Sequence, residues 1–344
     1  MDTFFFSEKY KKFSSKRRSL YALYFFLFSF LISLGAELIA NDKPLFVWYK
    51  QKAYFPVFAQ YSEQEFGGSF ATESNYRDPF VLKLIQDHGW MIWPLIPYSY
   101  STVNYNLKQP VPSPPSRENW LGTDDQGHDL LARLIYAYRF SISFGLLVMV
   151  ISVAVGLFMG AIQGYFGGYV DLFFQRLTEV WSGLPLIFLL ITVSALVRLN
   201  FISLVLMIAA FKWMFVVPVV RAEFLKARNL DYVKAARVMG SRSLTIIFRH
   251  ILPNVLSAPL TLIPFLLIAS ITLLATIDFL GFAPSFGPPS LGEILNQGKN
   301  NLYAPWIGLT GFIALTTLLT SLIFIGEGIR DAFRVQQSEE EMVL

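Results

Sequence analysis

Side chains that could carry out covalent chemistry are few in this chain, and their spacing matches none of the common catalytic or metal-binding patterns. The sequence has no cysteine, which excludes disulfides and thiolate metal sites. Its three histidines, His88, His128 and His250, lie in different segments, which argues against a histidine metal centre. No GxxxxGK[ST] phosphate loop, HExxH or GxSxG pattern occurs. We therefore predict no catalytic residue, no metal site and no cofactor in this chain, and no ATP hydrolysis by the phosphate-loop route.

A basic segment between two apolar stretches, residues 221–254, holds seven Lys and Arg side chains and suits contact with a partner. Within it, Asn229–Met239 is predicted to form a short helix that stops at Gly240, because glycine readily adopts the left-handed conformation of a helix end. Ser241 can cap a second helix, which is expected to end before Pro253. The pattern predicts a two-helix elbow.

Helical spacing separates the faces of the first predicted helix. At 100° per residue, Lys234 and Arg237 point away from a face of small and apolar side chains. That face consists of Tyr232, Ala235, Ala236 and Met239. The alanine pair leaves room for another backbone, which favours docking. The predicted stripe of the second helix consists of Leu244, Ile247, Phe248 and Ile251. Connector helices on a membrane surface would show the same stripe and charges, so periodicity alone leaves both interpretations open.

Composition indicates the environment of these helices. The chain is 54% hydrophobic, has 33 Phe and a mean hydropathy of +0.48, which is more apolar surface than a soluble fold of this length can bury. The apolar stretches of spanning length are 19–36, 140–164, 180–197, 201–220, 255–277 and 302–326. Because hydrocarbon offers no water to backbone polar groups, we predict an all-α membrane protein with six transmembrane helices.

Lysine and arginine near the helix ends predict the orientation. Six lie in residues 1–18, seven in 221–254, and two, Arg330 and Arg334, follow the last helix, so these segments are expected in the cytoplasm. The 41–139 segment holds nine, but a segment of that length can translocate despite them. Loop placement accounts for the net charge of +4, so we predict no nucleic-acid partner.

These assignments divide the chain into five parts. They are a cytoplasmic tail at 1–18, a first transmembrane helix at 19–40, an external loop at 41–139, a core of five helices with the basic segment at 140–328, and a cytoplasmic tail at 329–344. A basic region precedes the first helix, as in a secretory signal. Ile39-Ala40-Asn41 is a poor cleavage site, which favours a retained helix.

Lys212 is the one ionisable residue well inside a predicted span, 201–220. A charge at the bilayer centre costs about 3 kcal/mol on insertion scales, so a lysine there is a candidate to line a pore. A long lysine side chain can instead extend its ammonium group to the interface. Three prolines, Pro185, Pro218 and Pro264, are expected to kink their helices.

Two further patterns concern helix packing. A small-residue stripe recurs every four residues on the second predicted helix and permits close backbone approach. It consists of Ser152, Gly156, Gly160 and Gly164. We expect it to contact a helix of the same chain, with a partner chain as the alternative. Residues 123–139 have the pattern of an amphipathic helix lying along the external interface, or of simple packing over the helix ends.

The basic segment also resembles a known motif. Tyr232-Val233-Lys234-Ala235-Ala236-Arg237-Val238-Met239-Gly240, followed after ten residues by Ile251-Leu252-Pro253-Asn254, resembles the "EAA" coupling loop of ABC-importer permeases, in the form of the dipeptide and oligopeptide branch. The general pattern begins with Glu where this chain has Lys234, and it has Ile at the position of His250. Both departures look like the peptide-importer version.

The resemblance covers nearly the whole chain. The segment Asn119–Tyr136, NWLGTDDQGHDLLARLIY, is similar to the one that leads into the second helix of C-type peptide permeases. The resemblance continues into Ser290-Leu291-Gly292-Glu293 and Gly328-Ile329-Arg330-Asp331-Ala332. The Asn41-Asp42-Lys43-Pro44 start and the long external loop after it look like the branch that imports microcin C and related oligopeptides.

The resemblance implies a type I ABC-importer permease in a bacterial inner membrane, and the Lys and Arg distribution places both termini in the cytoplasm. It implies three protein partners: a second homologous permease, an ATP-binding-cassette ATPase that binds ATP and Mg²⁺, and a periplasmic or lipid-anchored substrate-binding protein. The ATPase-docking residues that it implies are Tyr232, Val233, Ala235, Ala236, Met239 and Gly240.

The long external loop is rich in aromatic residues and proline, so it has apolar mass to bury and is predicted to fold. It could cap the external mouth or meet a substrate-binding protein, and its aromatic residues could equally form a belt at the membrane interface. An ion-coupled secondary transporter is the alternative function. It would be expected to show internal repeats, interrupted helices and several buried ionisable groups, of which the sequence offers only Lys212.

Overall fold

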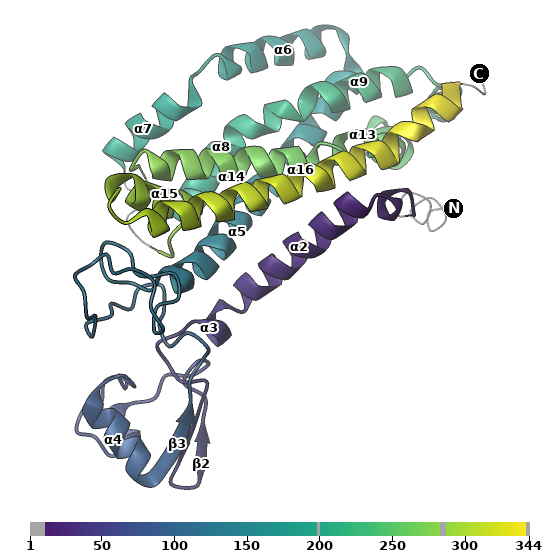
Figure 1. Ribbon diagram of the computed structural model, residues 1–344. Coiled ribbons are helices and arrows are strands. Elements are labelled where there is room, and N and C mark those ends of the chain that lie inside the picture. The colour runs from purple at the N-terminus through teal and green to yellow at the C-terminus, as the bar shows by residue number, and fades with distance from the viewer. Residues whose placement is uncertain (1–10, 198–199, 283–286, 342–344) are drawn as a thin grey trace.

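The apolar stretches form a bundle of long helices, and part of the segment between the first two helices forms a separate small lobe (Figure 1). The computed structural model describes residues 11–197, 200–282 and 287–341. The two predicted cytoplasmic tails, 1–18 and 329–344, lie partly outside the described residues.

Six apolar units make up the bundle. Within the described chain, three are continuous and long enough to cross a membrane: α2 (Arg17–Leu34), α5 (Leu130–Phe166) and the Pro305–Phe333 part of α16 (Pro305–Glu341). Two are bent pairs, α6 (Gly168–Ser182) with α7 (Leu186–Leu196) at 66°, and Phe201–Phe215 with α9 (Val217–Ala227) at 41°. The last, α14 (Ile263–Phe279), is a shorter apolar helix of 17 residues. These units overlap the six predicted stretches, and three to five of them reach spanning length.

Each of the three prolines lies at the start of a helix that follows a break, and bends are present at Pro185 and Pro218, where kinks were expected. Pro185 caps α7 at the 66° bend, Pro218 is the second residue of α9, and Pro264 is the second residue of α14. The remaining helices are α3 (Ala36–Ile39), α8 (Phe201–Lys212), η2 (Trp213–Phe215), α10 (Asp231–Val238), α11 (Ser243–Thr245), η3 (Ile246–Ile251), α12 (Leu252–Val255), α13 (Ser257–Leu260) and α15 (Leu291–Asn300).

The small-residue stripe of α5 packs against α9 of the same chain, which confirms the expected intrachain contact. A Cβ atom on Gly160 would lie 2.7 Å from the Cβ of Val220, and one on Gly164 would lie 2.4 Å from the Cβ of Phe224. Gly156 is equally close to Val216, at 2.5 Å. No side chain larger than hydrogen fits at these positions without moving α9 away from α5.

Helix α5 begins earlier than predicted. The sequence suggested a separate surface helix at 123–139 before a span at 140, but one helix runs unbroken from Leu130 to Phe166. The apolar side chains of its first turns, including Leu130 and Tyr136, are buried against the chain and do not lie along a membrane surface. Residues 123–129 form a turn, and the side chain of Asp129 caps the helix by accepting from Ala132 N at 2.8 Å.

The lobe corrects the prediction of an all-α fold, which holds for the bundle but is wrong between residues 46 and 92. Three antiparallel strands, β1 (Phe46–Tyr49), β2 (Lys52–Tyr54) and β3 (Gly89–Ile92), form a sheet in the order β2-β1-β3. α4 (Pro79–His88) and η1 (Glu63–Phe66) complete the lobe. Strand β1 alternates buried and exposed side chains, the period-two pattern of a strand with one covered face. Its buried side chains join Phe66 and Ile85 in a small core, so the segment folds as predicted.

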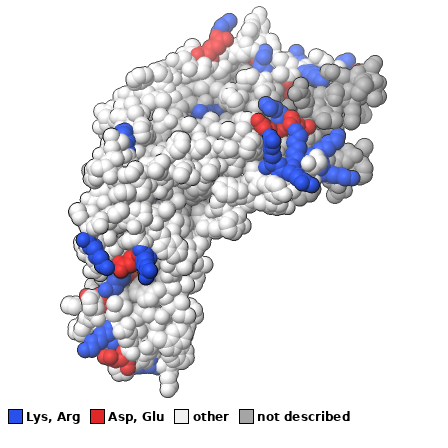
Figure 2. All heavy atoms as spheres, in the orientation of Figure 1, with Lys and Arg blue, Asp and Glu red and all other residues white. Residues whose placement is uncertain are grey.

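The two ends of the bundle differ in what they carry. The start of α2, the end of α16 and α13 lie together at one end, and the lobe lies beyond the other (Figure 1). Lys16 and Asp331 form an ion pair that joins α2 to α16 at the first end. On the face drawn in Figure 2, charged side chains gather at the two ends and are sparse between them. This distribution suits a bundle whose middle lies in hydrocarbon.

Candidate functional site

The elbow forms from α10, Gly240 and the helical residues 243–255. Gly240 has φ +78°, and its N–H bonds to the carbonyl of Arg237 at 3.0 Å, while Ser241 N–H reaches the carbonyl of Ala236 at 3.1 Å. The predicted helix and its stop at glycine are confirmed. A Cβ atom on Gly240 would meet nothing within 4 Å, so the left-handed backbone, rather than space, is what favours glycine there.

The six predicted docking residues divide between two faces of the elbow. Val233 is 0% exposed and Ala236 2%, because both pack inside the chain. Tyr232, Ala235 and Met239 are exposed, as is Gly240. The prediction that Ala236 shares a face with the other three is therefore wrong. Val233 and Ala236, three residues apart, form the inner stripe of α10 and leave the rest of the helix outside.

The outward face of α10 includes one residue that the sequence analysis did not select. Val238 is 88% exposed and Met239 is 78% exposed. Val238 and Met239 lie three and four residues after Ala235, which is the signal that could have identified Val238. An apolar side chain exposed at the turn of an elbow, next to charged residues, is typical of a surface that another protein covers.

The second half of the elbow departs from the predicted geometry. η3 is a π-helix, which changes the spacing of its faces. Ile246, Ile247 and Ile251 are buried, while Leu244 and Phe248 of the predicted stripe are exposed. Arg242, and not Ser241, occupies the capping position. The chain also stays helical past the predicted stop, because η3 runs directly into α12 and Pro253 is the second residue of α12.

Contacts fix the elbow to the bundle. Val233 and Ala236 share one apolar cluster with Val220 and Phe224 of α9. The guanidinium of Arg237 lies 5.6 Å from the centre of the Tyr165 ring, near the end of α5. Next to it, Arg228 Nη1 donates to the carbonyl of Gly164 at 3.4 Å, and Arg221 makes two bonds of 2.5 and 2.6 Å to Asp171. These contacts join the elbow to α5 and α9.

Lys212, the pore candidate, is the last residue of α8 and is half-buried. It lies four residues before the 41° bend at Val216 that precedes α9. Just before it, the carbonyl of Ala210 accepts from Trp213 Nε1 at 2.8 Å and from Trp181 Nε1 at 3.1 Å. At this break, two indole N–H groups thus donate hydrogen bonds to one backbone carbonyl. The role of Lys212 in a pore stays a prediction.

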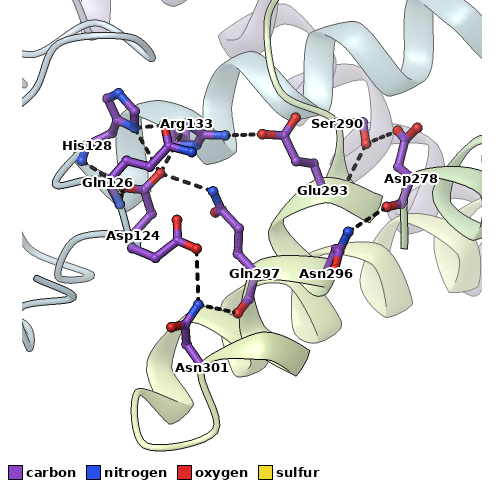
Figure 3. Close-up of polar contacts among 11 residues, drawn as sticks. Asp124, Gln126, His128, Arg133, Asp278, Ser290, Glu293, Asn296, Gln297 and Asn301 are labelled. Atoms are coloured by element: carbon purple, nitrogen blue, oxygen red, sulfur yellow. Dashed lines mark hydrogen bonds and ion pairs between the residues drawn. The ribbon is translucent and has the colours of Figure 1, made fainter. Parts of the chain in front are cut away.

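At the opposite end of α5, a buried polar cluster joins segments that are far apart in the sequence (Figure 3). Asp124 Oδ2 contacts His128 Nδ1 at 2.9 Å, Arg133 Nη1 at 3.1 Å and Gln297 Nε2 at 3.3 Å. Arg133 Nη2 also bonds Glu293 Oε1 at 2.5 Å. We call these five residues the polar cluster. It ties the turn before α5 to α15.

Burial alone would raise the pKa of Asp124, but the hydrogen bonds from His128 and the positive charge of Arg133 outweigh it and hold this pKa below its usual range. Neighbouring Asp129 differs, because burial raises its pKa despite the bonds from Ala132 and Asn119. The carboxylate of Asp124 is thus held charged, as a buried group paired with a guanidinium should be.

Further contacts extend this junction to α14 and α16. Ser290 Oγ caps α15, accepting from Glu293 N at 3.1 Å, and donates to the buried carboxylate of Asp278 at the end of α14. Trp306 Nε1 in α16 donates to the carbonyl of Thr123 at 3.2 Å. The sequence analysis singled out the two segments, Asn119–Tyr136 and Ser290–Glu293, but did not predict that they meet. The only feature of the sequence that could have indicated this contact is the presence of opposite charges in the two segments.

Among the described residues, no group of three His, Cys, Asp or Glu side chains could hold a metal ion. The two candidate functional regions described above are therefore an elbow that exposes apolar side chains and a polar cluster that joins helices. Neither offers a nucleophile poised beside a base. Their arrangement suits the transmission of movement through α5.

Comparisons with known proteins identify the family of the chain. The family described as "Binding-protein-dependent transport system inner membrane component" matches residues 152–334, which include the elbow and the α15 part of the polar cluster. The chain is similar to the inner membrane ABC transporter permease protein YejE of Escherichia coli (strain K12), with 50% identity over 94% of this chain and 95% of that one. Among solved structures, the inward-facing MetNI methionine ABC transporter aligns at a TM-score of 0.48 and 17% identity, covering 59% of this chain and 97% of that one.

Two other relatives carry names that mention a cargo. The chain is 45% identical to the peptidoglycan transport system permease protein YejE of Agrobacterium fabrum, over 94% of this chain and 91% of that one. It is 34% identical to the oligopeptide transport system permease protein OppC of Mycobacterium bovis, over 73% of this chain and 87% of that one. The chain therefore belongs to the family of binding-protein-dependent transport system inner membrane components.

Proposed function

We propose that the chain is the membrane-spanning permease subunit of an ATP-binding-cassette importer for oligopeptides or peptide-like compounds of the microcin C type. The names of its relatives support a peptide-like cargo, since one is a peptidoglycan and another an oligopeptide transport permease. The chain makes and breaks no covalent bond in this function. ATP, with Mg²⁺, is hydrolysed by a partner subunit.

The observation that carries the proposal is the elbow, whose inner stripe is packed on α5 and α9 and whose outer face exposes Tyr232, Val238 and Met239. In the proposed mechanism the ATPase covers this outer face. When the ATPases close on ATP, the displacement of α10 moves α5 and α9, and the cavity between the permeases opens to the other side. A second homologous permease and a periplasmic or lipid-anchored binding protein complete the transporter.

The proposed topology has six crossings of a bacterial inner membrane in a type I importer fold. They are α2, α5, α6 with α7, α8 with α9, α14, and α16. Both termini and the elbow lie in the cytoplasm, and residues 41–129 lie outside. The grouping of the start of α2, the end of α16 and α13 at one end of the bundle supports this topology. Because the chain has no cysteine, single cysteines at 235 and 86 test it with an impermeant reagent in intact cells. Labelling at 235, or protection at 86, would contradict the orientation.

The alternative of an ion-coupled secondary transporter predicted interrupted helices, and two bent pairs are present. Membership of a family defined by dependence on a binding protein outweighs this feature. The deciding experiment is peptide uptake into proteoliposomes that hold the purified complex. Uptake that requires ATP and the binding protein supports the importer, whereas uptake driven by a proton or sodium gradient without ATP refutes it.

A further inference from the structure

The sheet of the lobe has one face that carries only apolar side chains. In the strand register, Trp48 lies opposite Ala53 on β2 and opposite Trp90 on β3, while Phe46 lies opposite Ile92. Residues opposite one another project to the same side of a sheet, so these five share a face. Phe55 extends it, because its ring lies 5.4 Å from that of Phe46 in an edge-on contact. We call these six residues the aromatic face.

The aromatic face is exposed, although its residues are among the most apolar in the lobe. Trp90 is 52% exposed, Ile92 48%, Phe55 47% and Trp48 38%. The alternate residues Val47 and Tyr49 point the other way into the core of the lobe. The lobe therefore already has its own core, and the aromatic face is a second apolar surface that the lobe itself leaves uncovered.

The chemistry of the aromatic face limits what can cover it. It has no charged side chain, hydroxyl or carboxamide, and its only side-chain polar atoms are the two indole N–H groups of Trp48 and Trp90. A peptide or a sugar bound here would lose hydrogen bonds to water and find few replacements. Tryptophan rings are instead enriched where hydrocarbon meets lipid headgroups.

The lobe is held close to the end of the first helix. The two segments that form β1 and β3 stay hydrogen bonded back to α3, through Leu45 N to the carbonyl of Ile92 at 2.8 Å and Ile96 N to the carbonyl of Ile39 at 2.9 Å. This junction packs on the start of α5, where Tyr136 Oη donates to the carbonyl of Ala40 at 3.0 Å. The lobe is thus fixed relative to the bundle.

The aromatic face adjoins the part of the chain that faces lipid. The outer half of α2, a helix long and apolar enough to span a membrane, exposes Phe28, Leu31 and Leu34, and the short α3 exposes Leu38. In Figure 1 the strands lie on the side of the lobe toward α2, and α4 lies on the far side of the sheet. Since α4 covers the inner face, the aromatic face is turned to the α2 side.

We propose that the aromatic face binds the outer surface of the phospholipid bilayer beside α2, with its rings at the depth of the headgroups. This contact sets the height and tilt of the lobe above the membrane. It is independent of the transported substrate and of the ATPase, so it can be tested on the full chain alone.

The test uses two single-cysteine variants in the cysteine-free chain. Ala53→Cys lies on the aromatic face and retains every ring, while Gln86→Cys lies on exposed α4 and serves as the matched control. Each full-length variant carries an environment-sensitive fluorophore and is reconstituted in nanodiscs of phosphatidylethanolamine and phosphatidylglycerol. We expect a blue-shifted emission at 53 that nitroxide-bearing lipids quench and aqueous iodide does not. At 86 we expect the reverse.

A second variant shows whether the fluorescence at position 53 reports contact with the membrane or only the protein groups next to the dye. Trp48→Ser with Trp90→Ser, added to Ala53→Cys, should abolish quenching by lipid and restore quenching by iodide. If the label at 53 is as open to iodide as the label at 86, the proposal is wrong. It is equally wrong if position 53 becomes shielded only when a substrate-binding protein is added, because the aromatic face then docks a protein.

Discussion

Replacement of Val238 by aspartate tests whether the outer face of the elbow docks an ATPase. The side chain is 88% exposed in the chain alone, so the substitution leaves the folded permease unaffected. Burial of a valine-sized side chain in an interface contributes about 1.5–3 kcal/mol, and a carboxylate in its place must also be desolvated. We expect a loss of about 3 kcal/mol, or about a 100-fold weaker affinity for the ATPase.

Two controls separate docking from folding. Asn229→Asp places the same charge at another exposed position just before α10 and is expected to keep the ATPase bound. Ala236→Asp places it on the inner stripe, where the side chain is 2% exposed, so this variant should lower the thermal stability of the permease itself. Only Val238→Asp should lose the partner while keeping its own stability.

The assay is co-purification of the ATPase from detergent-solubilised membranes, together with peptide uptake and the melting temperature of the permease. Co-purification and uptake of Val238→Asp at wild-type levels would refute the reasoning, because an apolar interface cannot accept an unpaired carboxylate without cost. If Val238→Asp is instead as unstable as Ala236→Asp, the face is not free in the permease and the elbow has been oriented wrongly.

Other predictions concern the helix seam, the polar cluster and the pore candidate. Gly160→Val should push α5 away from α9, cost about 1–3 kcal/mol of stability and lower the melting temperature. Gly35→Ala should not lower it, because the nearest atoms to a Cβ there are 3.7 Å away. Equal melting temperatures for the two variants would contradict the close contact. Arg133→Leu should cost about 3–5 kcal/mol, because it removes the guanidinium that pairs with the buried carboxylate of Asp124 and with Glu293, and an unchanged melting temperature would disprove it. Since the pKa of Asp124 is lowered in the folded chain, its stabilising contribution should be complete above its unfolded pKa and be lost as the pH falls through the folded one. Asp124→Asn should flatten that acid dependence in melting curves, and an unaltered curve would exclude the role. Lys212→Met should reduce uptake but not ATPase binding if Lys212 lines the pore, and normal uptake would exclude that role.

Local rules predicted the parts of the elbow that depend on neighbouring residues. The left-handed conformation of Gly240 and the extent of α10 follow from glycine and from helix-capping preferences, which need no knowledge of the rest of the chain. Which face of α10 turns inward depends on what α9 and η3 present to it. The spacing of Tyr232, Ala235, Ala236 and Met239 therefore could not show that Ala236 is buried, and the π-helical turn that hides Ile246 has no recognised sequence signal.

The remaining differences between the sequence-based predictions and the structure come from contacts between residues that are far apart in the sequence. Asp124 and Gln297 are far apart in the chain, and only the packing of α15 on α5 brings them to 3.3 Å. The glycine stripe on α5 was recognisable because close approach requires small residues, although the partner helix could be identified only from the fold. The sheet of the lobe was missed because its strands are three or four residues long, too short for alternation to stand out among so many aromatic residues.

The unbroken length of α5 has a consequence for the transport cycle. Its 37 residues, at 1.5 Å each, span about 55 Å, so one rigid rod reaches from the polar cluster to the elbow. An α-helix of this kind transmits a push or a tilt along its axis with little loss, since shortening it requires breaking its own hydrogen bonds. We therefore expect the two ends of α5 to change state together rather than in sequence. A single probe at either end of α5 should therefore report the timing of both.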